Sequence, residues 1–218
     1  MPDMTVLLIS LVAVFVIFAL IIIIGCSNYR IAKRAKFKIT SMFPYELQNY
    51  WNMPYTTYIR FLAGLFAVSY SLFGLCAFFS CDVAISKILI VTLILSAFMM
   101  MIIIYVNMNV VKIHLSLAVV LFVLCLLNYG IMTILLLGGQ PFYLPNWLGY
   151  ITLAISIFYL GSLFNPKLYK WMMLEKKESE EGMTILSRPK YFVLPIYEWV
   201  TIALNLLIIV LITIGYLV

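Results

Sequence analysis

Long apolar runs, separated by polar connections, dominate the pattern along this chain of 218 residues. A helix needs about 20 mostly apolar residues to cross roughly 30 Å of hydrocarbon. The runs are continuous and lack the polar alternation of a transmembrane strand, so they predict helices rather than a barrel. Six spans are expected, of which the fifth is the shortest: Met4–Gly25, Phe61–Phe79, Ile88–Val106, Leu115–Leu137, Leu148–Leu163 and Val200–Val218.

Composition strengthens this prediction, because 66% of the residues are hydrophobic and only 10% are charged. A soluble domain is usually about 45–50% apolar and about a quarter charged. A single soluble core of this length cannot bury so much apolar surface. We therefore expect one membrane domain over residues 1–218, an all-α six-helix transmembrane bundle with one or two cytoplasmic interfacial amphipathic helices. The N-terminal run is expected to be a retained span rather than a signal peptide.

The basic residues indicate how the spans are oriented. Of the 14 Lys and Arg residues, thirteen lie in or beside the connections after the first, third and fifth spans, and Lys87 stands alone on the other side. Cytoplasmic connections carry an excess of Lys and Arg. This bias predicts a cell-membrane protein with both termini outside and the two long basic connections in the cytoplasm.

The stretch "FPYELQNYWNMPY", residues 43–55, precedes the second span and carries five aromatic residues. If it is helical, one arc of the helical wheel holds its large apolar side chains. An amphipathic helix in the headgroup plane is expected, because Tyr and Trp rings favour that interface. We interpret it as an interfacial anchor rather than a gate beside a cavity, with the contacts made by Phe43, Leu47, Tyr50 and Trp51.

The connection after the fifth span contains a second apolar stretch, residues 168–174, followed by the charged run "EKKESEEG". A second interfacial helix is predicted to run into this charged segment, where Lys176 and Glu180 have helical i, i+4 spacing. The exposed mixed charge also makes the segment a natural docking place for a cytoplasmic partner.

Polar side chains are sparse inside the spans, and three of them are candidate solute contacts: Tyr70, Asn128 and Asn205. An amide in hydrocarbon needs a partner, so the two asparagines are expected to face other helices or a water-filled cavity, and they can meet each other. Interhelical hydrogen bonds are the favoured interpretation, and a solute site is the alternative.

Ala63, Ala67 and Ser71 recur every four residues in the second span. Small residues permit close backbone approach, so this stripe predicts a helix-packing face, inside the molecule or towards a partner. A disulfide between Cys76 and Cys81 is left open by the sequence.

His114 is the only histidine, and it lies beside Asn107, Asn109 and Lys112 at the cytoplasmic mouth of the fourth span. A general base needs an orienting partner and a nucleophile within hydrogen-bond reach. No second catalytic group is visible, so a histidine satisfied by water or headgroups is favoured. No cofactor, metal ligand set or catalytic set is expected.

Charge is also missing from the membrane midplane, since Arg60 and Glu198 lie at cytoplasmic span ends, where we expect them to reach water. Ion-coupled transport is therefore disfavoured. The favoured function is a non-catalytic subunit, assembly or regulatory component of a membrane complex. A channel or carrier for an uncharged or lipid-like solute is second, and a lipid-acting membrane enzyme is third. Expected partners are membrane lipids and either another membrane protein or a second copy, but not nucleic acid.

Overall fold

A computed structural model of the protein describes residues 4–48, 55–80, 83–106, 111–138, 144–169, 175–178, 184–187 and 191–217. Six long helices form within these residues: α1 (Met4–Lys33), α2 (Thr56–Ser80), α3 (Ala84–Tyr105), α4 (Val111–Leu137), α5 (Trp147–Leu163) and α7 (Val193–Leu217). All except α5 are long and apolar enough to cross a membrane, and α5 has 17 residues. The predicted all-α membrane bundle, including its short fifth helix, is confirmed.

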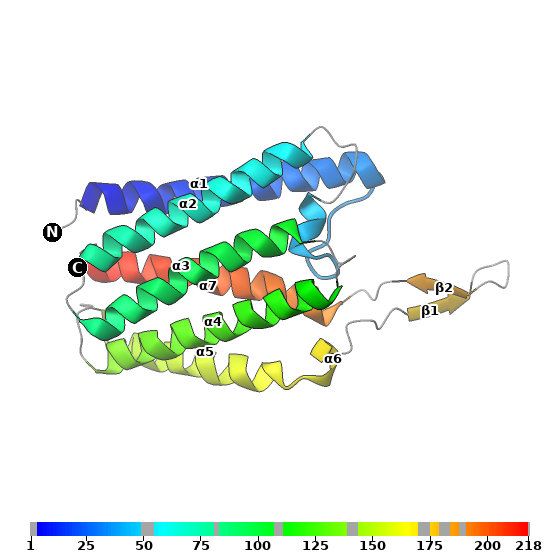
Figure 1. Cartoon of the computed structure of the whole chain (residues 1–218). Coiled ribbons are helices and arrows are strands. Elements are labelled where there is room, and N and C mark those ends of the chain that lie inside the picture. Colours follow the sequence, from blue (N-terminus) through cyan, green and yellow to red (C-terminus); the bar gives the residue numbers. More distant parts are fainter. Residues whose placement is uncertain are drawn as a thin grey trace.

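The helices α1 to α5 pack in chain order, each against the next, as antiparallel neighbours (Figure 1). The last helix, α7, then packs mainly against α4, with smaller contacts to α1 and α3. Both termini lie at one end of the bundle, and the short elements lie at the other end (Figure 1). We call this second end the hairpin end.

The helices extend beyond the predicted spans, most of all at the end of α1 and at the start of α7, because a helix can continue where the hydrocarbon stops. The first, α1, continues to Lys33, where basic residues near its last turn favour the negative end of the helix dipole. Arg34 follows with φ of 51°, a left-handed conformation that commonly ends helices. The last helix begins at Val193 rather than Val200, and Pro195 is tolerated in its first turn because amide groups there lack intrahelical acceptors.

The predicted anchor segment is folded into the protein. Residues Pro44–Leu47 form a single 3₁₀ turn, η1, and its neighbour Phe43 is 2% exposed while Leu47 is 1% exposed. Lipid-facing roles for Phe43 and Leu47 were therefore wrong, since protein covers both side chains. The predicted anchors Tyr50 and Trp51 lie outside the described residues.

The structure describes only part of the second predicted interfacial helix. One helical turn, α6 (Pro166–Tyr169), is present, and residues 170–174 lie outside the described part of the chain. The first four residues of the charged run instead form strand β1 (Glu175–Glu178), which pairs antiparallel with β2 (Thr184–Ser187). The helical spacing of Lys176 and Glu180 was thus misleading, because Lys176 pairs with Leu186 across a hairpin.

The small-residue stripe of α2 does face the interior of this chain at two positions. Ala63 and Ala67 are at most 1% exposed, whereas Ser71 is half-buried. Close approach of backbones at such residues is a common packing device in membrane bundles. These two alanines therefore contribute to packing within the protein rather than to a partner surface.

Substituting Gly25 tests whether η1 is seated against α1. A Cβ atom added at Gly25 would lie 2.7 Å from Leu47 Cβ, which is fixed to the backbone of η1. Gly25→Ala should therefore force η1 to shift and destabilise the protein by about 1–3 kcal/mol, as overpacking does. Thermal unfolding in mild detergent measures the effect.

Gly64→Ala is the matched control, because nothing lies within 4 Å of the added atom. Alanine should there be neutral or stabilise the helix by up to about 1 kcal/mol. Equal melting temperatures for the two variants would contradict the contact between Gly25 and Leu47.

Candidate functional site

The residues singled out in the sequence fall into two buried clusters. Tyr70, Asn128 and Asn205 meet in the middle of the bundle, and His114 lies at the hairpin end. All four side chains are 0% exposed. Their bonding partners decide whether either cluster can act on a ligand.

In the central cluster, the two amides contact each other directly. Asn128 Nδ2 donates to Asn205 Oδ1 at 3.1 Å and to Ser96 Oγ at 3.0 Å. The Tyr70 hydroxyl donates to the backbone carbonyl of Asn205 at 2.8 Å. Asn205 Nδ2 in turn donates to the carbonyl of Thr201, one turn earlier on α7. The cluster therefore joins α2, α3, α4 and α7 at one level.

These bonds use the polar groups that a solute would need. Interhelical hydrogen bonds of this kind contribute about 0.6 to 2 kcal/mol each in membrane proteins. Within the described residues, Asn128 Oδ1 is the one side-chain oxygen or nitrogen of these three residues that is buried without a partner. The arrangement is that of a structural junction between helices.

The end cluster pairs His114 with a residue 84 positions away. His114 Nε2 lies 3.0 Å from Glu198 Oε1, and both side chains are 0% exposed. The other ring nitrogen, Nδ1, lies 2.8 Å from the carbonyl oxygen of Val106. Expectations that His114 is satisfied by water or headgroups, and that Glu198 reaches water, were therefore wrong.

The contacts of this pair determine how many protons His114 and Glu198 carry together. A carbonyl oxygen only accepts, so His114 Nδ1 carries a hydrogen and donates it to Val106. A second proton must then lie between Nε2 and Glu198 Oε1, on either the ring or the carboxyl group. The pair is neutral overall in both arrangements, which lowers the cost of burying it.

Two polar side chains at this end, Gln48 and His114, bond the end of α3. The last carbonyls of a helix have no intrahelical donor and need other partners. Gln48 Nε2 donates to the carbonyl of Ile104 at 2.7 Å, and His114 donates to that of Val106. Arg60 Nε holds the Gln48 side chain from its other side at 2.7 Å. Capping of α3 thus accounts for the polar residues gathered here.

Aromatic rings from the segment around η1 cover the histidine. The rings of Phe43 and Tyr45 meet the His114 ring edge-on, with centroids 5.9 and 5.3 Å away. Glu46 Oε2 accepts the backbone amide of Phe43 at 2.8 Å, which closes the turn. Phe192, just before α7, packs on Phe43 from the other side.

A histidine oriented by a carboxylate is a familiar general-base arrangement. Here both ring nitrogens are already bonded within the protein, and protein side chains cover the ring. The geometry therefore supports a packing and capping role. One signal for the pair is visible in the sequence, since Glu198 is the only acidic residue at the start of the last span.

Three further residues that the sequence analysis considered have no described position. Asn107 and Asn109, placed beside His114 in the sequence, and Cys81, the possible partner of Cys76, lie outside the described residues. Among the residues that the structure describes, no group of three His, Cys, Asp or Glu side chains lies close enough to hold a metal ion.

Comparison with known proteins gives no match to a protein family, a curated protein or a solved structure. The function must therefore be argued from the geometry of this chain.

Replacing His114 alone tests the buried pair. His114→Leu leaves the Glu198 carboxyl group buried without its partner, and removing one member of a buried pair destabilises a protein by roughly 3–5 kcal/mol. The double variant His114→Leu/Glu198→Leu should recover most of this loss, because two apolar side chains replace the pair. Thermal unfolding in detergent would measure both, and additive losses would contradict the pairing.

Proposed function

We propose that the protein is a non-catalytic, multi-pass component of a membrane complex, acting as a subunit, assembly factor or regulator. The observation that carries this proposal is the β1–β2 hairpin, which projects away from the helices at the hairpin end (Figure 1). We infer that a protein partner joins the chain there.

In our proposal the hairpin lies in the cytoplasm and the bundle lies in the cell membrane. Of the 14 Lys and Arg residues, ten lie in described segments at the hairpin end, including Arg30 and Lys33 near the end of α1. Lys87, in the first turn of α3, belongs to the opposite end. Because cytoplasmic connections are enriched in Lys and Arg, this distribution favours outward-facing termini.

The hairpin is a small sheet to which a further strand can be added. It contains two strands of four residues each, and a two-stranded hairpin alone is marginally stable in water. A strand with an unpaired edge is a template for a strand from another chain. All four residues of β1 are charged, whereas β2 has the sequence TILS. Charges discourage edge pairing, so β2 is the edge on which we expect the partner strand.

The two alternative functions receive no support from the geometry. A solute pathway lined by Tyr70, Asn128 and Asn205 would compete with the hydrogen bonds that these residues make to one another. An enzyme acting through His114 would need a free ring nitrogen, and both are engaged. Binding of a protein partner at the hairpin requires neither cluster to break its hydrogen bonds.

A charged residue on β2 should prevent partner binding. Ile185→Lys introduces the type of residue that blocks edge pairing, and we expect it to weaken the complex roughly tenfold or more, or about 1.4 kcal/mol. The measurement is the molar ratio of partner to tagged chain after purification from native membranes in mild detergent.

Ile39→Lys is the matched control, because Ile39 is an exposed isoleucine in the connection after α1, at the same end of the bundle. It should leave the partner ratio unchanged. A lone, monodisperse wild-type chain, or equal loss in both variants, would refute the proposed role of the hairpin.

Orientation is tested separately. In intact cells, protease added outside should remove a tag at the N-terminus and should leave a tag inserted between β1 and β2 untouched, because the positive-inside rule assigns the hairpin to the cytoplasm. Cleavage of the inserted tag and protection of the terminal tag would reverse the orientation.

A further inference from the structure

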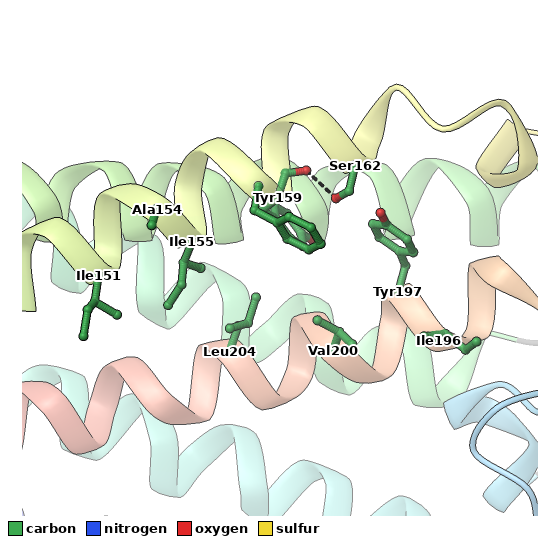
Figure 2. A pocket seen from close by; sticks show the side chains of 10 residues that line it. Ile151, Ala154, Ile155, Tyr159, Ser162, Ile196, Tyr197, Val200 and Leu204 are labelled. Atoms are coloured by element: carbon green, nitrogen blue, oxygen red, sulfur yellow. Dashed lines mark hydrogen bonds between the residues drawn. The ribbon is translucent and has the colours of Figure 1, made fainter.

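A cluster of exposed basic residues lies at the hairpin end of the bundle, where α1 ends. All five members are exposed, and they are Arg30, Lys33, Arg34, Lys36 and Lys38. The next acidic residue in the sequence is Glu46, which is only 7% exposed. The side of the bundle differs, since the groove between α5 and α7 is lined by uncharged residues such as Ile155 and Val200 (Figure 2). We call residues 34–38 the basic segment.

The chain reverses direction at the start of the basic segment. Arg34 has φ of 51°, a left-handed conformation that is uncommon for residues other than glycine. Beyond Arg34 the chain returns to the bundle, because the Phe37 ring packs edge-on against the Tyr29 ring of α1, with centroids 5.3 Å apart. Tyr29 lies four residues, or about 6 Å, before the last residue of α1. The basic segment therefore lies beside the bundle instead of extending away from the membrane.

Contacts with α7 hold the basic segment at this depth. The centroids of the Phe37 and Trp199 rings are 6.1 Å apart, again with the rings edge-on. Trp199 lies six residues, or about 9 Å, beyond the first residue of α7. Two hydrogen bonds fasten the chain just after the segment, since the Trp199 indole donates to the carbonyl of Met42 and the Phe192 amide donates to that of Thr40. The segment is thus part of the folded bundle.

Lys36 and Lys38 stand on either side of the packed ring in the sequence. Phe37 is half-buried, whereas both lysines are exposed. Among the residues that the structure describes, no carboxylate pairs with either ammonium group. The packing of Phe37 therefore presents two neighbouring cations, without an acidic partner, on the outside of the bundle.

The depth of the basic segment corresponds to the edge of the hydrocarbon. Ile31, between Tyr29 and the end of α1, is 61% exposed, and Tyr58 near the start of the neighbouring helix α2 is also 61% exposed. An exposed apolar side chain on a membrane helix favours the hydrocarbon, and an exposed tyrosine favours its interface. Because the segment packs beside this level of α1, its ammonium groups lie near the plane of the phospholipid phosphates.

We propose that the basic segment binds the phosphate groups of anionic phospholipids in the leaflet at the hairpin end, chiefly through Lys36 and Lys38. A cluster of roughly four to eight Lys and Arg residues directly after a membrane helix is typical of anionic-lipid binding. A segment that is already fixed also loses less conformational entropy on binding than a free tail does. The proposed orientation enters only in naming this leaflet, which is the cytoplasmic one. The site is independent of the hairpin and of any protein partner.

The first test removes the charge. The full-length protein is delipidated in mild detergent and titrated with phosphatidylglycerol or phosphatidylcholine, and bound lipid is counted by native mass spectrometry. Wild type should prefer phosphatidylglycerol, and Lys36→Gln/Lys38→Gln should reduce this preference roughly tenfold, since each nearby cation adds several-fold to the attraction of an anionic lipid. Lys87→Gln/Lys112→Gln is the control of equal net charge, because it removes two cations from the first turns of α3 and α4, and it should keep the preference.

The second test keeps every charge and releases the segment. Phe37→Ala removes the ring that packs on Tyr29 and Trp199, so the two lysines are no longer held beside the membrane and the preference for phosphatidylglycerol should fall several-fold. Phe37→Leu keeps an apolar side chain in the same place and should retain the preference. Thermal unfolding in the same detergent shows whether both variants are folded.

Several outcomes would overturn the assignment. Equal binding of the two lipids by wild type would remove the anionic headgroup, and equal losses in the two lysine pairs would remove the basic segment as the site. A folded Phe37→Ala variant with the wild-type preference would show that net charge acts without the packed segment. Displacement of phosphatidylglycerol by inorganic phosphate would identify a soluble anion as the occupant. Because the assay uses the purified chain alone, its failure leaves the test of the hairpin unaffected.

Discussion

The need to pair polar side chains inside hydrocarbon determines where α7 lies. This helix enters the bundle after the longest connection in the chain, and its polar side chains select its neighbour and its depth. Asn205 supplies that selection by contacting Asn128 on α4, and Glu198 supplies it again by contacting His114 on the same helix. An apolar helix can slide against its neighbours at small cost, but a helix carrying two buried polar links cannot slide without leaving groups unpaired. The relation between α7 and α5, where the Tyr159 and Thr201 hydroxyls lie 2.6 Å apart, follows from this fixed position.

The same pairing explains why the hairpin end is closed. Once Glu198 holds His114 inside the protein, the ring needs apolar cover, and Phe43 and Tyr45 provide it. Gly25 leaves space on α1 for Leu47, so the η1 turn fits between helices instead of resting on the membrane surface. The closed end therefore results from helix capping and ring packing.

Much of the fold could be predicted from the sequence, because the signals that define it are local. An apolar run identifies a span wherever its neighbours lie, and an amide such as Asn128 in that run requires a partner. Which side chain forms that hydrogen bond depends on residues far away in the sequence. Neither the pairing of His114 with Glu198 nor the capping of α3 by Gln48 has a signature in sequence spacing. Helical wheels failed at residues 43–48 for a related reason, since an apolar arc does not indicate whether lipid or protein will cover it. The charged segment at Glu175–Glu178 matched a helical salt-bridge spacing, but strand pairing with residues 184–187 prevailed.

The short link between β2 and α7 has a mechanical consequence. Only five residues separate Ser187 from Val193, and the link is fastened just before the helix begins, where the Phe192 amide donates to the carbonyl of Thr40 at 2.8 Å. About two turns further on, the Trp199 indole donates to the carbonyl of Met42 at 2.8 Å. Tension on the hairpin would therefore be borne first by the stretch that covers the histidine, and only afterwards by the membrane helix. A partner that binds the hairpin would therefore also restrain the stretch around η1 that covers the His114 ring.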